Sequence, residues 1–184
     1  DTISISLDGG ATVVASATAA SGQWSITLPS NALAAGTNTL TITSTNTAGN
    51  STVISKNVDF DAQNPVVGQA NIDVGYTGGV PTGLHIGSQI KLLFTPDAGE
   101  VDTSALIVSF DVSQFTGATT PEWQLATWNS VTSRYELDYT VPADGLNNNA
   151  ITFEVKAVDP AGNETVTQAW DVLVVDNSAP DLTN

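Results

Sequence analysis

The sequence has 184 residues, of which 41% are hydrophobic, and it contains no Cys. Its 19 acidic residues outnumber 4 basic residues, which gives a net charge of -15. This composition provides enough apolar material for a folded core. It excludes a disulfide framework and a Cys-based metal site, and it argues against nucleic acid or an anionic membrane surface as partners. Since no run of 18 apolar residues is present, we also expect no membrane insertion.

Short β-strands are predicted along the whole chain, because apolar residues alternate with polar ones and no long segment has a helical period. The strands of the first part are expected at 2–7, 11–18, 22–28, 37–45 and 51–60. Those of the second part are expected at 66–75, 87–95, 104–113, 121–128, 134–142, 150–158 and 165–175. Gly, Pro, Asn and Asp fill the connections, so the pattern predicts an all-β sandwich fold.

A sequence repeat links the two parts. Residues 24–52 align with residues 137–165 without a gap, and apolar residues alternate in both copies. Each copy therefore predicts a strand, a Pro-led connection, a second strand, a tight turn with the letters AGN, and a third strand. The matched positions include Pro29 with Pro142, Leu40 with Phe153, and Gly49 with Gly162.

The repeat and two sequences of the form D-x-x-x-P, at 61–65 and 176–180, define the expected domains. We predict a first domain at 1–63, a complete second domain at 64–180 and the start of another linker at 181–184. Compared with the second domain, the first lacks two initial strands. Either the sequence begins inside a domain or another segment supplies these strands.

The W-S-I-T-L-P stretch from Trp24, the AGN turns and the D-x-x-x-P exits resemble tandem bacterial Ig-like domains of large secreted adhesins and biofilm proteins, including RTX-type adhesins. The resemblance implies two Ig-like β-sandwich domains at an extracellular or bacterial cell-surface location. It implies that the domains are extenders, which hold a binding domain away from the cell, and that calcium stiffens their junctions. The partners would be neighbouring Ig-like repeats of the same chain or of identical subunits.

Acidic loop residues indicate where calcium would bind in such a tandem. In an Ig-like sandwich, two loops of one domain share the end that receives the exit of the preceding domain. Carboxylates gathered there would repel one another unless a divalent cation with six to eight oxygen ligands neutralised them. The predicted ligands at this junction are Asp61, Asp97, Glu100, Asp159 and Asn163, with Asp102 and Glu164 in reserve and Asp176 beginning an equivalent site with the next repeat.

The alternative is that these residues are ordinary solvated turn acids, which favour loops because they bond their own backbone. In the first domain, Asn46 stands where the second has Asp159, so a site there would be weaker or absent.

Enzymatic activity is not expected. His85 is the only histidine, and its surroundings contain no nucleophile motif. The Gly-rich segment 75–83 lacks the Lys and the helix of a phosphate-binding loop. We therefore predict no catalytic residue and no bound organic cofactor.

Two other functions are open alternatives. The incomplete first domain would expose a sheet edge, so the chain could be a filament subunit that neighbours complete by strand donation. Trp123, Trp128 and Tyr135, or the Thr-rich stretch 37–47, could serve a glycan, ice or host-surface ligand. However, two Trp residues five apart on an unbroken strand point to opposite faces, and alternating Thr is common on the solvent face of a strand.

Overall fold

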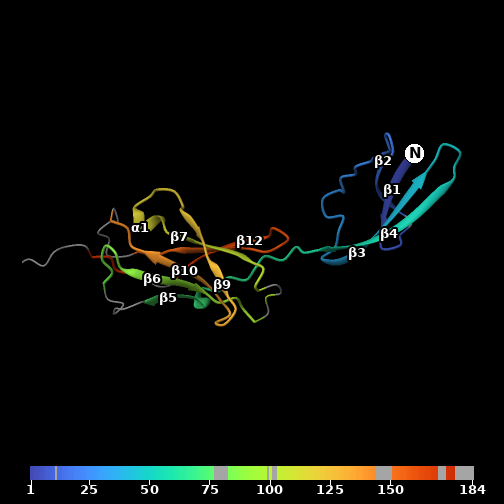
Figure 1. Ribbon diagram of the computed structural model, residues 1–184. Coiled ribbons are helices and arrows are strands. Elements are labelled where there is room, and N and C mark those ends of the chain that lie inside the picture. Colours follow the sequence, from blue (N-terminus) through green and yellow to red (C-terminus); the bar gives the residue numbers. More distant parts are fainter. Residues whose placement is uncertain are drawn as a thin grey trace, which may run out of the picture. The chain divides into compact units, whose positions relative to one another are not determined.

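The computed structural model describes residues 1–10, 12–76, 83–98, 100, 103–143, 151–169 and 173–176. The chain divides into two compact units, residues 1–62 and residues 63–184. The all-β prediction is confirmed, because strands form three antiparallel four-stranded sheets among the described residues (Figure 1). The helices in these residues are short: η1 (Gln69–Asn71) and α1 (Ser113–Thr116). Neither is long or apolar enough to cross a membrane. The predicted linker at 181–184 and the reserve ligand Asp102 lie outside the described residues.

Unit 1 contains a sheet with the strand order β2-β1-β3-β4. Its strands are β1 (Thr2–Leu7), β2 (Val13–Thr18), β3 (Gly36–Thr45) and β4 (Ser51–Phe60). Across the sheet, Ile5 lies opposite Ile42, and Ile42 lies opposite Ile54. Because residues directly opposite each other share a face, these three isoleucines form an apolar row and the neighbouring Thr positions face the other way.

Unit 2 is a sandwich of two sheets in its described residues. One has the order β5-β6-β10-β9, and its strands are β5 (Ile72–Tyr76), β6 (Gln89–Phe94), β9 (Thr127–Asn129) and β10 (Arg134–Thr140). The other has the order β12-β11-β7-β8, and its strands are β7 (Ile107–Asp111), β8 (Trp123–Leu125), β11 (Glu154–Val158) and β12 (Glu164–Gln168).

The core of unit 2 lies between the inner faces of these sheets. Alternate residues of the strands point inward and are almost completely buried, among them Leu92, Phe94, Phe110 and Val155. Phe110 and Phe153 pack with ring centroids 5.9 Å apart. Burial of this apolar surface is the main force that holds the two sheets together.

The prediction of one strand at 121–128 is wrong. The segment forms two short strands in different sheets, β8 and β9, which are separated at Ala126. The Ala126 backbone N donates to the Val108 carbonyl, and beyond this point Trp128 turns inward onto Tyr135. Alternation of apolar residues cannot show that a chain changes sheets, because both sheets bury the same kind of residue.

The prediction of a strand at 22–28 is also wrong. Residues 22–28 are all described, and their β pairing is limited to one isolated bridge between Gln23 and Ala20. The aligned strand in unit 2 is β10, which is bonded to β6 on one side and β9 on the other. A strand needs a neighbour for its backbone hydrogen bonds. The described part of unit 1 contains no equivalent of β6, so the apolar alternation at Trp24, Ile26 and Leu28 is present without the pairing.

The strand order of unit 1 repeats that of one sheet of unit 2. Strands β2, β1, β3 and β4 take the places of β8, β7, β11 and β12. The AGN turn connects β3 to β4 in unit 1 and β11 to β12 in unit 2. The sequence repeat thus corresponds to a repeat of sheet topology.

Candidate functional site

Two loops of unit 2 carry four of the predicted calcium ligands. Residues 95–106 connect β6 to β7, and residues 159–163 connect β11 to β12. Val158 pairs with both Ile107 and Glu164, so the two loops lie at the same end of the sandwich. Their predicted ligands are Asp97 and Glu100 in the first loop, and Asp159 and Asn163 in the second.

Asp159 holds the AGN turn of unit 2 together. Its Oδ1 accepts the backbone N of Asn163 at 2.9 Å, and its Oδ2 accepts Asn163 Nδ2 at 2.8 Å. Burial would raise the pKa of Asp159, but hydrogen bonds from the side chain of Asn163 and from the backbone of Asn163, Gly162 and Ala161 outweigh it and lower the pKa. Asp159 is therefore an ionised carboxylate with a structural partner.

Asp97 and Glu100 brace the other loop against the start of unit 2. Asn71 Nδ2 donates to Asp97 Oδ1 at 2.5 Å, and the backbone N of Val66 donates to Glu100 Oε2 at 3.0 Å. The backbone N of Glu100 also donates to the Asp97 carbonyl at 3.0 Å, which closes a turn. Both carboxylates thus fix the loop to the segment that leads into β5.

The two remaining predicted ligands, Asp61 and Asp176, belong to neither of these loops. Asp61 belongs to unit 1. The backbone N of Asp176 donates to the Leu84 carbonyl, next to the parallel bridge between Leu84 and Val175. Because Leu84 precedes β6 and the loop 95–106 follows it, Asp176 lies at the end of unit 2 opposite to Asp97.

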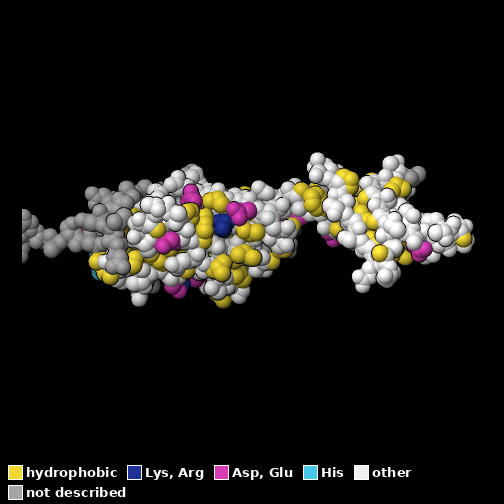
Figure 2. Space-filling view, turned by 90° about the horizontal axis from the view of Figure 1, so that it is seen from above, with side chains coloured by type: hydrophobic (Ala, Val, Ile, Leu, Met, Phe, Trp, Pro, Cys, Tyr) yellow, Lys and Arg dark blue, Asp and Glu magenta, His cyan; other side chains and the backbone are white. Residues whose placement is uncertain are grey.

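Among the described residues, no group of three or more His, Cys, Asp or Glu side chains is arranged to hold a metal ion. On the face drawn in Figure 2, acidic side chains are scattered over the surface. A cation at the loop end of unit 2 would therefore need further oxygen donors, because Ca²⁺ takes six to eight. The predicted reserve ligand Glu164 is the first residue of β12 and lies at the loop end of unit 2. Asp61 of unit 1 stays a prediction.

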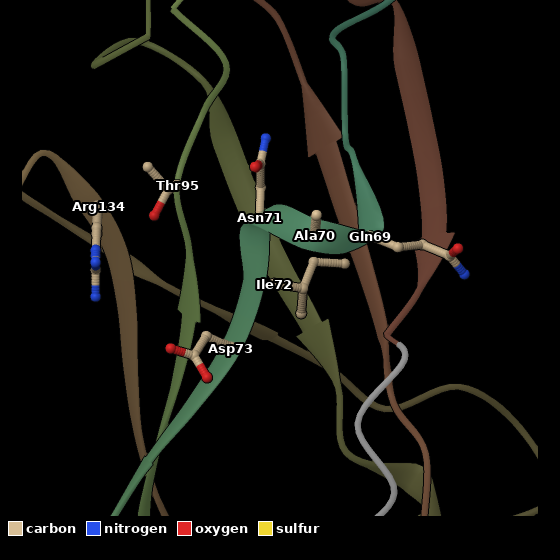
Figure 3. Close-up of a pocket in the computed structure, with 7 residues that line it drawn as sticks. All are labelled: Gln69, Ala70, Asn71, Ile72, Asp73, Thr95 and Arg134. Atoms are coloured by element: carbon tan, nitrogen blue, oxygen red, sulfur yellow. The ribbon is translucent and has the colours of Figure 1, made fainter.

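An open pocket lies beside η1 and the start of β5 (Figure 3). Figure 3 shows Asp73 of β5 and Arg134 of β10 on its lining, with Thr95 and Asn71 nearby. Asn71 connects this pocket to the loop 95–106, because its side chain donates to Asp97. Arg134 and Asp73 give the lining one positive and one negative charge, so its charge favours neither an anionic nor a cationic ligand.

Tyr135 is a structural residue that sequence reasoning treated only as a sugar-binding candidate. Its hydroxyl oxygen lies 2.8 Å from the Thr103 carbonyl oxygen and 2.9 Å from the Leu106 carbonyl oxygen. The hydroxyl is the hydrogen-bond donor to both carbonyls. Burial raises the pKa of Tyr135 and outweighs the opposing effect of the bond to Leu106. The side chain anchors the last part of the loop 95–106, a role that no local sequence signal could have identified.

Trp123 and Trp128 do not form an exposed aromatic row with Tyr135. Trp128 packs against Tyr135 with ring centroids 5.0 Å apart. Lys156 Nζ lies 4.5 Å from the centroid of the Trp123 ring and covers it. Each Trp ring is thus already engaged by a neighbouring side chain, which does not favour the glycan alternative.

The comparisons with known proteins agree with this fold. Residues 1–62 match the family model of a bacterial Ig-like domain. Unit 1 is Ig-like. The predicted resemblance is confirmed for this part of the chain, and the match to an Ig-like domain points to a structural protein rather than an enzyme, as predicted.

Two solved structures are similar to the chain. One is a Ca²⁺-stabilized adhesin that helps an Antarctic bacterium to reach out and bind ice, with 17% identity and a TM-score of 0.50 over 97% of this chain and 41% of that chain. The other is a 1.5-MDa bacterial ice-binding adhesin studied for host cell surface retention, with 17% identity and a TM-score of 0.46 over 97% of this chain and 54% of that chain. The chain thus spans about half or less of these structures, and at this identity the first likeness shows the fold alone. No curated protein matches the chain.

Proposed function

We propose that the chain is an extender segment of an extracellular bacterial adhesin, located at the cell surface and flanked by further Ig-like repeats. The observation that carries the proposal is the repetition of one strand order and one AGN turn in two consecutive units. A tandem of such units adds length without requiring a catalytic cleft. The fold likeness to an adhesin described as Ca²⁺-stabilized supports the same function.

Calcium is the proposed stiffening ligand. The loop end of unit 2 would supply Asp97, Glu100, Asp159 and Asn163, and the proposed clamp adds Asp61 from unit 1. Asp176 would begin the equivalent site toward the next repeat. The net charge of -15 favours such binding, because a bound divalent cation neutralises carboxylates that repel one another. Dissolved salt only screens this repulsion.

Calorimetric titration of the metal-stripped chain tests the calcium proposal. We expect heat of binding and a rise in melting temperature that grows with the Ca²⁺ concentration, since a ligand that binds only the folded state stabilises it. The double variant Asp97→Asn, Glu100→Gln should weaken both effects. Asp138→Asn is the matched control, because it removes one carboxylate from the exposed outer side of β10. A chain that shows neither heat nor stabilisation at millimolar Ca²⁺ would rule out the clamp.

Solution scattering tests the extender function. With Ca²⁺ present, the maximum dimension should be larger than in a chelator, because a clamped linker holds the two units apart. Two copies of the chain fused in series should be close to twice as long. A fused protein that stays as compact as the single chain would contradict extension, whatever its calcium affinity.

A further inference from the structure

The chain enters unit 2 at one end of the sandwich, and its last described residues lie at the other end. Val66, which precedes β5, donates its backbone N to Glu100 in the loop 95–106, so the incoming segment lies at the loop end. Asp176 lies at the opposite end, where its backbone N donates to the Leu84 carbonyl. A pull on the chain from both sides of unit 2 therefore acts along the length of the sandwich.

The first and last strands of this path belong to different sheets. β5 is bonded to β6, and β12 is bonded to β11. Both strands start at the loop end, because Ile72 of β5 pairs with Phe94 at the end of β6, and Glu164 of β12 pairs with Val158 at the end of β11. The apolar packing between the sheets is non-directional, whereas a hydrogen bond weakens steeply when its atoms are displaced.

Two side-chain hydrogen bonds join the segment before β5 to β12 across the two sheets. Thr167 Oγ1 donates to the Val67 carbonyl at 2.9 Å, and Gln69 Nε2 donates to the Gln168 carbonyl at 2.9 Å. Figure 3 shows the Gln69 side chain on η1 pointing away from Thr95, which lies on the far side of the pocket. We call these two hydrogen bonds the strand link. They connect residues that are 100 and 99 positions apart in the sequence.

We propose that the strand link bears load in unit 2, by passing force from the incoming segment directly to β12. A pull along the sandwich draws the incoming segment toward the loop end and β12 toward the opposite end, so the two hydrogen bonds are stretched together. Both must break before the two strands can slide past each other. This mechanical role rests on the proposed extender function, since an extender is held at both ends. The link itself involves neither calcium nor unit 1.

Single-molecule pulling of the full chain in a chelator tests the proposal. Because the sequence contains no Cys, attachment at Ala62→Cys and Asn184→Cys loads unit 2 along its length. The test variants are Thr167→Val and Gln69→Leu, which each remove one donor of the strand link. At a given force we expect each variant to unfold about fivefold faster than the parent, and the double variant to unfold faster still, because loss of one hydrogen bond changes a rate by about this factor.

Thr165→Val is the matched control, because it makes the same substitution two positions away on the same face of β12. A second pair of attachment points, Thr120→Cys and Val131→Cys, flanks β8 and β9 and loads these strands instead of β5 and β12. In this direction Thr167→Val should change the unfolding rate no more than Thr165→Val does, since the strand link is not on the path of the force.

The direction of the pull separates a load-bearing role from a general loss of stability. An effect of Thr167→Val that has the same size in both directions would overturn the proposal. So would end-to-end unfolding of the double variant at the rate of the parent. The scattering experiment on the extender function measures length and not resistance to force, so the extender function and the strand link can fail independently.

Discussion

Asn163 donates two hydrogen bonds to Asp159, from its backbone N to Oδ1 and from its side-chain Nδ2 to Oδ2. In unit 1, the backbone N of Asn50 donates to Asn46 Oδ1 at 3.0 Å, so the same turn is closed without a charge. In both turns the first residue also accepts a backbone hydrogen bond from the Gly, at 3.0 Å in unit 1 and 3.1 Å in unit 2. The two turns should differ in their response to acid, because Asp159 can be protonated and Asn46 cannot.

Asp159→Asn should reduce the acid sensitivity of unit 2. The hydrogen bonds from Asn163 lower the pKa of Asp159 below its unfolded value, so their stabilisation is complete above about pH 4 and is lost as the pH falls through the lowered pKa. The variant keeps the Oδ1 acceptor, as Asn46 does, but loses the second acceptor. Urea unfolding in chelator at pH 7 and pH 3 measures both effects. A variant with the same pH dependence as the parent would contradict this assignment.

Gly162→Ala should destabilise unit 2 by about 1–2 kcal/mol, the cost of a left-handed conformation for a residue with a Cβ. Gly162 has a φ of 93°, and a Cβ built there would meet no atom within 4 Å, so the cost arises from the backbone rather than from a clash. Gly162→Asn is the control and should cost less, because Asn adopts positive φ more readily. Equal losses for Ala and Asn, measured by denaturant unfolding, would argue against this cause.

Tyr135→Phe should destabilise unit 2 by about 1–2 kcal/mol, because it leaves the Thr103 and Leu106 carbonyls without their hydroxyl donor. Tyr139→Phe removes a hydroxyl from the same strand and serves as the control. Hydrogen exchange should show faster opening of residues 103–106 in the Tyr135 variant alone. If both variants lose the same stability and the loop amides do not respond, the anchoring role of Tyr135 is wrong.

Glu136→Gln should lower the free energy of unfolding more than Asp138→Asn does. Both carboxylates form an ion pair with Lys91 Nζ, which lies 2.9 Å from Glu136 Oε2 and 3.1 Å from Asp138 Oδ1. The Glu136 side chain is 16% exposed and also accepts Asn129 and Thr132, whereas the Asp138 side chain is 82% exposed. We expect about 1 kcal/mol or less for Glu136→Gln and close to none for Asp138→Asn, since exposed ion pairs contribute little.

The pH dependence of this network gives a separate readout. The hydrogen bond from Lys91 is the largest cause that lowers the pKa of Glu136, so the stabilisation is present above pH 4.5 and fades as the pH falls through the lowered pKa. The pKa of Lys91 is raised, chiefly by its bond to Glu136, so its contribution fades only when the pH rises above its ordinary value of 10.5. Thermal unfolding between pH 3 and pH 7 should show a flatter profile for Glu136→Gln than for the parent.

Local features of the sequence determined most of the strands. Two-residue alternation identified β1, β3, β4, β6 and β10, and the AGN letters identified both tight turns, because Gly49 and Gly162 occupy positive φ. The Ig-like topology implied by the resemblance placed the loops of Asp97 and Asp159 at one end of unit 2, and the pairing of Val158 with both Ile107 and Glu164 confirms this placement. Whether those loops bind Ca²⁺ is a separate question, which depends on donors brought together in space.

Tertiary structure decided the features that depend on a partner strand or a distant contact. Residues 22–28 have the alternation of β10 but form no paired strand, because backbone hydrogen bonds require a neighbour such as β6. Residues 121–128 split between two sheets, since an apolar side chain is equally stable in either inner face. The hydroxyl of Tyr135 reaches backbone carbonyls about thirty residues away, and only the packed sandwich brings them within hydrogen-bond distance.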